Sequence, residues 1–175
     1  MDTVTITSGK YRGRKIATPG AATHPMGSRE RLALFNMLDE RIKNAYLLDA
    51  FAGSGALGIE ALSRGSIKVV FVDDSVKAVQ TIKKNLKVLG IDKEATVIKT
   101  KAANIGNDFL NFDVILADPP YDNFNQGEIE CLTNTLKSGG LMALSHPDDA
   151  PVLEGLTLLK SRQYANAHVS IYVKN

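Results

Sequence analysis

Short apolar runs alternate with stretches of helical spacing from Tyr46 to the end of the chain. Continuous apolar strands that alternate with helices are typical of a parallel sheet covered on both faces. The pattern predicts strands at 46–51, 68–73, 95–99, 112–117 and 139–146, helices at 56–65, 75–90, 102–110 and 126–137, and a closing antiparallel pair at 156–164 and 167–174. We therefore expect an α/β, doubly wound, mostly parallel seven-stranded sheet, with its ligand at the carboxyl ends of the strands.

The first 45 residues show a different pattern. Polar and apolar residues alternate in "TVTIT", and "SGKYRG" follows with turn residues, which together predict a β-hairpin ahead of the main sheet. A helix is expected next, with Ser28 as its N-cap. Its apolar positions are Leu32, Leu34, Phe35 and Leu38. We divide the chain into an N-terminal appendage, residues 1–45, and a main domain, residues 46–175.

Length and composition favour a single globular domain. With 175 residues and 44% apolar content, the chain is long enough to form one hydrophobic core. It has neither an apolar run long enough to span a membrane nor the pattern of a signal peptide, so we expect a cytoplasmic protein and, at this size, a monomer. The single cysteine, Cys131, is expected to be a packing residue, and no cysteine and histidine spacing predicts a metal site.

The positive charge of the chain is concentrated in its N-terminal segment. Residues 1–45 hold eight Lys and Arg against four Asp and Glu, whereas residues 46–175 hold thirteen against fifteen. A basic segment on a nearly neutral body suggests that one end contacts a polyanion. The alternative is a solvated hairpin without a partner.

A glycine-rich loop follows the first strand of the main domain. Gly53, Gly55 and Gly58 have the G-x-G-x-x-G spacing of nucleotide-binding loops, although an ordinary tight turn would also allow it. Asp49 discriminates between ligands, because its carboxylate would repel a pyrophosphate and attract an ammonium and a sulfonium. This favours S-adenosylmethionine over NAD. Asp73 ends the second strand, where a carboxylate can accept hydrogen bonds from ribose hydroxyls. Its neighbour Asp74 could share that role or cap the next helix.

The sequence "DPPY" follows the fourth strand. Asp118 precedes Pro119 and Pro120, which stiffen the loop and leave the Pro119 carbonyl without a competing N–H group. The carboxylate and this carbonyl could accept both hydrogens of an exocyclic amino group and offset its developing charge. Tyr121 could receive the face of the base by stacking. The alternative is a proline-rich turn with Tyr121 packed in the core.

Taken together, these motifs resemble the bacterial 16S ribosomal RNA guanine-N2 methyltransferase family. "GKYRGRKIATP", "SRERLALFNML", "LLDAFAGSGALGIEALSRG" and "ADPPY" carry the resemblance almost from end to end. It implies a Rossmann-like methyltransferase fold and transfer of a methyl group from S-adenosylmethionine to a guanine of small-subunit RNA within a protein-bound 30S particle or assembly intermediate. The cofactor residues expected are Asp49, Phe51, Ala52, Gly53, Ser54, Gly55, Asp73, Asp74 and Ala102. The catalytic residues expected are Asp118, Pro119, Pro120 and Tyr121.

The chain departs from the family pattern at two places. "THPM" (23–26) stands where relatives usually show T-R-P-T, and "KTKAAN" offers Lys101 and Ala102 where many relatives carry an acid or amide near the adenine. The adenine is then expected to rest on backbone groups or on Asn104. Among the histidines, His24 lies beside the basic segment and is a candidate RNA contact, whereas His146 and His168 are expected to be structural.

The basic front end is expected to bind RNA phosphates. The residues expected to do so are Lys10, Arg12, Arg14, Lys15, Arg29 and Arg31. For the last two, exposure to solvent without a partner is the alternative.

Other functions stay open at this point. A DNA adenine-N6 methyltransferase uses the same amino-group chemistry but usually carries an added recognition region. A protein-glutamine methyltransferase would show Asn before the two prolines, and cytosine-C5 methylation needs a nucleophilic cysteine. A non-catalytic RNA-binding factor for ribosome assembly, with a methyltransferase shell, is the alternative from another class.

Overall fold

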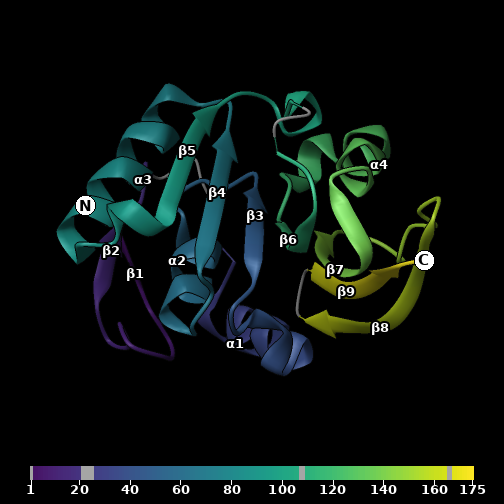
Figure 1. Ribbon diagram of the computed structural model, residues 1–175, viewed down its shortest axis with the longest axis horizontal. Helices are drawn as coiled ribbons and strands as arrows, with labels where there is room; N and C mark the ends of the chain where they lie inside the picture. Colours follow the sequence, from purple (N-terminus) through teal and green to yellow (C-terminus); the bar gives the residue numbers. More distant parts are fainter. Residues whose placement is uncertain (1, 21–25, 107–108, 165–166) are drawn as a thin grey trace.

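A seven-stranded sheet forms the centre of the computed structural model, which describes residues 2–20, 26–106, 109–164 and 167–175 (Figure 1). The strands are β3 (Tyr46–Ala50), β4 (Lys68–Asp73), β5 (Ala95–Lys99), β6 (Phe112–Ala117), β7 (Leu136–His146), β8 (Leu156–Tyr164) and β9 (Ala167–Lys174). Their order is β5-β4-β3-β6-β7-β9-β8, and β9 runs antiparallel to both of its neighbours. The strand order reverses between β3 and β6, which is where such sheets bind ligands. The expected fold class is confirmed.

Helices cover both faces of this sheet. The helices α1 (Ser28–Leu38), α2 (Ala56–Ser63) and α3 (Val76–Leu89) share one core cluster, and α4 (Gln126–Thr133) belongs to a second one. Consecutive strand residues point into different clusters: Leu47 belongs to the first and Leu48 to the second. Both are fully buried, which explains why the strand has a continuous apolar sequence.

The N-terminal hairpin packs into the same core as the main domain. It consists of β1 (Thr3–Thr5) and β2 (Lys15–Ala17), which form a separate two-stranded antiparallel sheet among the described residues. Val4, Ile6 and Ile16 are buried in the cluster that contains α2. The side chain of Asn85 on α3 accepts a hydrogen bond from the Ala17 N–H and donates one to the Ala17 carbonyl, both at 2.9 Å. The segment 1–45 therefore has no core of its own among the described residues.

Local signals placed α3 well. Ser75 is its N-cap, with a side chain that accepts a hydrogen bond from the Ala78 N–H, and Gly90 ends it in the left-handed conformation. The cap expected for α1 is wrong, because the Gly27 carbonyl already accepts the Arg31 N–H at 2.9 Å, so the N-cap is Gly27 and Ser28 is the first helical residue. Leu32 on this helix is exposed, unlike the other three apolar positions.

Two predicted helices are shorter than expected. The helix expected at 126–137 ends at Thr133, and Leu136 already begins β7, because a strand beside β6 uses these backbone groups in the sheet. The helix expected at 102–110 is one turn of 3-10 helix over Ala102–Asn104, and residues 107–108 lie outside the described ranges. The 3-10 turns are η1 (Asp39–Ile42), η2 (Asp92–Glu94), η3 (Ala102–Asn104) and η4 (Tyr121–Asn123).

None of the described helices is long and apolar enough to cross a membrane.

Candidate active site

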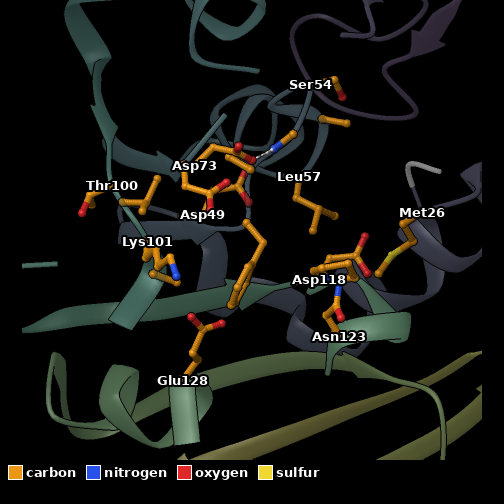
Figure 2. Close-up of a pocket in the computed structure, with 18 of the residues that line it drawn as sticks. Met26, Asp49, Ser54, Leu57, Asp73, Thr100, Lys101, Asp118, Asn123 and Glu128 are labelled. Carbon is orange, nitrogen blue, oxygen red and sulfur yellow. Dashed lines mark hydrogen bonds between the residues drawn. The ribbon is translucent and has the colours of Figure 1, made fainter. Parts of the chain in front are cut away.

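A cavity of about 500 Å³ opens at the carboxyl ends of β3, β4, β5 and β6. Figure 2 shows Asp49 and Asp73 on one side of it and Asp118 and Asn123 on another, with Thr100, Lys101 and Glu128 at a third. Met26 and Leu57 approach from the side of α1 and α2. The glycine loop and the "DPPY" segment, 60 residues apart in the chain, thus face one space, as the order of strands β3 and β6 requires.

The glycine loop turns sharply between β3 and α2. Phe51 has a φ of 63° and Gly53 a φ of 54°, so the backbone is left-handed twice within three residues. The Gly53 N–H then donates to Asp73 Oδ2 at 2.8 Å, which joins the loop to the end of β4. Gly58 has another role, since its small size lets α2 lie against Phe71 and Asp49. The predicted loop is therefore both strained and closely packed.

Asp49 is the most deeply buried acid of the cavity. Its side chain is 1% exposed, and its Oδ2 accepts the Gly58 N–H at 2.8 Å. Burial raises the pKa of this carboxyl well above its usual value, and the nearby Asp118 and Asp73 act in the same direction. None of the ion pairs of the described residues involves Asp49. A cation entering the cavity would stabilise its ionised form.

Asp73 and Asp74 both line the cavity. Asp73 accepts the Gly53 N–H with one oxygen and the Ser75 N–H, at 2.9 Å, with the other. Each oxygen keeps a further lone pair for a ligand hydroxyl. Asp74 is exposed and does not cap α3, because Ser75 does.

The "DPPY" segment is only partly directed into the cavity. Asp118 and Pro120 line it, whereas Pro119 is buried and Tyr121 lies outside its lining. Tyr121 is half-buried, and its hydroxyl forms a short hydrogen bond with Ser145 Oγ on β7. The hydroxyl therefore anchors the ring, and stacking of a base on it stays a prediction.

Asp118 has an unusually basic carboxyl group. Burial raises its pKa to about 6, although hydrogen bonds from the Ser145 hydroxyl and the Met26 N–H act in the opposite direction. At neutral pH most of this carboxyl is ionised and can accept hydrogen bonds. Met26 precedes α1, so the N-terminal segment directly contacts the expected catalytic acid.

The other expected cofactor residues divide into two groups. Those lining the cavity are Asp49, Phe51, Ala52, Gly53, Ser54, Asp73, Asp74 and Ala102. Gly55 is outside the lining and serves as the N-cap of α2, with a φ of 78°. Asn104, considered for the adenine, is also outside it, whereas Lys101 and Glu128 are inside.

The RNA-binding role expected for Arg31 is wrong, because its side chain is buried. Its side chain is 1% exposed and lies 3.6 Å from the carboxylate of Glu60, which is itself fully buried. It also donates to the carbonyls of Thr5, at 2.6 Å, and Met26, at 3.2 Å. Arg31 therefore joins the hairpin, the start of α1 and the glycine-loop helix, and cannot reach an RNA phosphate from this position. Arg29, in contrast, is exposed.

The remaining basic residues lie far from the cavity. Lys10, Arg12, Arg14 and Lys15 are exposed, and the Lys10 N–H donates to the carbonyl of Ser63 at the carboxyl end of α2. The amino end of α2 faces the cavity, and its eight residues span about 12 Å at 1.5 Å per residue. In Figure 1 the hairpin reaches below the sheet, while the arrowheads of β4 and β5 point upward. The basic turn, which carries Lys10, Arg12, Arg14 and Lys15, therefore does not form the rim of the cavity.

Neither the described histidines, His146 and His168, nor Cys131 lines the cavity. His146 is buried between the Asp148 carbonyl and the Ser170 hydroxyl, both at 2.8 Å, and stacks on His168. His24 and most of "THPM" lie outside the described residues. Cys131 is exposed, so its expected packing role is wrong. Among the described residues, no group of three or more His, Cys, Asp or Glu is arranged to hold a metal ion.

Several site residues escaped the sequence analysis. Met26, Arg31 and Glu128 line the cavity, Ser145 lies beside Asp118 outside the lining, and the buried Glu60 pairs with Arg31. Serine in an apolar strand and a lone acid in a short helix carry no local signal for such a role. Only for Arg31 and Glu60 did the sequence contain an indication of burial, because each is a charged residue on an otherwise apolar helix face.

The fold, the strained glycine loop and the acids at the switch point define an α/β methyltransferase domain. The chain belongs to the family described as Conserved hypothetical protein 95, whose model matches residues 4–173. It is 36% identical over 173 residues to Ribosomal RNA small subunit methyltransferase D of Haemophilus influenzae, covering 91% of this chain and 88% of that relative.

Solved structures agree with this assignment. A protein of Haemophilus influenzae provisionally described as a methylase has a TM-score of 0.82 and 32% identity, with 99% of each chain covered. An Escherichia coli protein provisionally described as a methyltransferase has a TM-score of 0.89 and 27% identity, with 99% of this chain and 98% of that one covered. The resemblance inferred from the motifs is confirmed, and the chain is a methyltransferase of the ribosomal RNA small-subunit group.

Proposed function

We propose that the protein transfers a methyl group from S-adenosylmethionine to the exocyclic N2 amino group of a guanine in 16S ribosomal RNA. The observation that carries this proposal is the placement of Asp118, a carboxyl with a pKa of about 6, in the same cavity as the buried acid Asp49. One acid suits a cationic cofactor, and the other suits an amino group. The relative in Haemophilus influenzae is named for methylation of small-subunit ribosomal RNA, which supports the choice of substrate.

The cavity fits S-adenosylmethionine by its chemistry. Asp49 offers a buried negative charge to the ammonium and sulfonium groups, and Asp73 offers oxygens to the ribose hydroxyls. The adenine end would lie near Lys101, Ala102 and Glu128, which line the cavity beyond Asp73. When bound, this cofactor supplies an electrophilic methyl group.

The residues of the chain orient the acceptor nitrogen. The Asp118 carboxylate accepts one of its two hydrogens from the cavity lining. The second acceptor expected from the motif is the carbonyl of Pro119, a buried residue outside that lining. Holding both hydrogens turns the nitrogen lone pair out of the plane of the base. The two acceptors also stabilise the positive charge that develops on the nitrogen during transfer. Because Asp118 loses its acceptor character when protonated, kcat should fall as the pH drops through about 6.

RNA contacts are proposed for Lys10, Arg12, Arg14 and Lys15. Because their turn lies at the end of α2 remote from the cavity, they would hold RNA backbone at a distance from the modified base. Binding by such contacts releases counterions, so affinity should decrease steeply with salt. RNA already folded within a small-subunit particle would present its backbone to the basic turn and the target base to the cavity at the same time. The cytoplasm is the compartment in which such particles are available.

The decisive experiment uses small ribosomal subunits from cells that lack this enzyme. The protein and S-adenosylmethionine with a labelled methyl group are added, and the RNA is digested and its nucleosides identified. N2-methylguanosine is expected. A parallel reaction contains DNA in place of the subunits, and N6-methyladenosine formed only there would favour the DNA enzyme. RNA binding without any methylated product would favour a non-catalytic assembly factor.

Asp118→Ala tests the assigned chemistry. The substitution removes one of the two acceptors, so turnover should fall at least about 100-fold, while cofactor affinity stays within a few-fold. Asp122→Asn is the matched control, because Asp122 is exposed in the same loop and outside the cavity lining. Equal loss of cofactor binding in Asp118→Ala would show that Asp118 binds the cofactor and not the base.

Neutralising the basic turn tests the RNA contact. Replacing Lys10, Arg12, Arg14 and Lys15 by Gln should weaken RNA binding and lower the slope of log affinity against log salt by about 0.7–0.9 for each phosphate that is no longer neutralised. Lys160→Gln with Arg162→Gln is the control, since both residues are exposed on β8 at the opposite edge of the sheet. An unchanged slope in the fourfold variant would show that these four side chains are exposed to solvent and do not contact RNA phosphates.

A further inference from the structure

Ser145 is a buried polar residue beside the expected catalytic acid. It lies on β7, is fully buried, and does not line the cavity. In the parallel register of β6 and β7, Ala117 pairs with Leu144, so the next residues on each strand, Asp118 and Ser145, are neighbours on the same face of the sheet. Adjacent strands are separated by about 4.8 Å, which brings a serine hydroxyl within reach of a carboxylate.

The hydrogen bonds of Ser145 have a defined direction. The Tyr121 hydroxyl and Ser145 Oγ are hydrogen-bonded, and the Ser145 hydroxyl lies beside the Asp118 carboxyl group, whose pKa it lowers as a donor. An ionised carboxylate only accepts, so the single hydroxyl proton of Ser145 points to Asp118. The proton of Tyr121 must then point to Ser145. The result is a chain of donors that runs from Tyr121 through Ser145 to Asp118.

This chain leaves Asp118 able to bind a substrate. A carboxylate has about four acceptor sites, and Ser145 and the Met26 N–H occupy two of them. The remaining sites can receive an amino hydrogen. The two bonds approach from β7 and from the segment before α1, so they fix the carboxylate from two sides.

We propose that Ser145 is a positioning residue that holds the Asp118 carboxylate in its acceptor orientation, with the Tyr121 hydroxyl completing the arrangement. The proposal rests on the proposed function, because it assigns the groups that prepare Asp118 for the amino group. It also assigns to Tyr121 a role through its hydroxyl, which is independent of any stacking by its ring.

The surroundings of Asp118 contain other titratable groups. Asp49 on β3 lies close enough for the charge of Asp118 to raise the Asp49 pKa, and the phenol of Tyr121 lies near both Asp118 and Glu30 of α1. Arg31 lines the same cavity, but its charge is paired with Glu60. Removal of the Ser145 hydroxyl therefore changes one donor to Asp118 and leaves these charges in place.

The test compares Ser145→Ala, Tyr121→Phe and the double variant with Ser170→Ala. Ser170 is the matched control because it is equally buried and hydrogen-bonded on β9, but it pairs with Leu144 and so lies on the other face of the sheet. In Ser145→Ala, kcat should fall about 10-fold or more, as expected for loss of a hydrogen bond to a charged group. The Kd for S-adenosylmethionine should stay within about twofold, because Ser145 is outside the cavity lining.

The pH dependence separates positioning from a merely structural role. Without its donor, the Asp118 pKa rises, so the acid limb of kcat should move upward from about 6 in Ser145→Ala and less in Tyr121→Phe. The double variant should resemble Ser145→Ala, because Tyr121 acts through Ser145. An acid limb that stays in place, or a loss of kcat no greater than in Ser170→Ala, would overturn the proposal.

A measurement without substrate keeps this inference separate from the proposed function. The Asp118 carboxyl can be titrated by carbon-13 NMR in the free protein, where Tyr121→Phe, a half-exposed substitution, should raise its pKa even if Ser145→Ala does not fold. An Asp118 pKa that is the same in wild type and Tyr121→Phe would overturn the proposed chain. Failure of the wild type to methylate RNA would instead overturn the proposed function and leave the titration result standing.

Discussion

Gly58→Ala should destabilise the protein, because a methyl group at this position has no room against Phe71 and Asp49. Gly58 lies inside α2, where alanine is favoured over glycine by about 1 kcal/mol. A Cβ at this position would overlap the ring of Phe71, with Cζ at 2.7 Å, and would lie 2.9 Å from Asp49 Oδ2. Phe71 and Asp49 are both buried, so neither can move aside without disturbing the sheet.

The expected loss of stability follows from these contacts. Overpacking a core costs about 1–3 kcal/mol, and the upper part of this range applies because two buried groups are involved. Weakening the hydrogen bond from the Gly58 N–H to the Asp49 carboxylate adds about 1 kcal/mol. After the helix-propensity gain of about 1 kcal/mol, the free energy of unfolding should decrease by about 2–3 kcal/mol. For a chain of 175 residues this lowers Tm by about 5–10 °C.

The assay is thermal and urea unfolding, followed by circular dichroism, with cofactor binding measured by calorimetry. Gly106→Ala is the control, since a Cβ there meets nothing within 4 Å, and it should change stability by less than about 0.5 kcal/mol. Adding Phe71→Leu should recover about 1–2 kcal/mol in the double variant, because it removes the ring that the new methyl group meets. If Gly58→Ala is as stable as the wild type, the close packing described for α2 is wrong.

Three further predictions concern buried charges. Burial raises the pKa of the Asp49 carboxyl in the folded protein, so ionisation of this group destabilises the fold as the pH rises through that pKa. Asp49→Asn removes this ionisation and should therefore raise Tm of the ligand-free protein. The same substitution should weaken S-adenosylmethionine binding at least about 100-fold. In the wild type, cofactor affinity should increase as the pH rises through the Asp49 pKa, since a cation binds the ionised form; a flat calorimetric profile would contradict this. Glu60→Gln leaves the buried Arg31 without its counter-charge and should cost about 3–5 kcal/mol in denaturant unfolding, whereas the exposed Glu40→Gln should cost less than about 0.5 kcal/mol.

Regular local patterns in the sequence predicted most of the fold. The strands of the sheet are continuous apolar runs because both of their faces are covered, and the boundaries of α3 follow from Ser75 and Gly90. The start of β7 was missed because Leu136 and Lys137 continue a helical pattern, and only pairing with β6 makes them a strand. The cap of α1 was missed by one residue, since Ser28 and Gly27 are both acceptable caps and the Arg31 N–H decides between them.

The sequence by itself determined which groups stand at the ends of the strands, because an acid or glycine after an apolar run is visible in one stretch of chain. It thereby predicted Asp49, Asp73 and Asp118 as members of one site. Only the tertiary structure decided what those groups touch. Ser145 reaches Asp118 through strand pairing, and Arg31 turns inward because Glu60, 29 residues later in the chain, is buried beside it. Contacts of this kind depend on register and packing between distant segments, and a local sequence pattern contains no information on either.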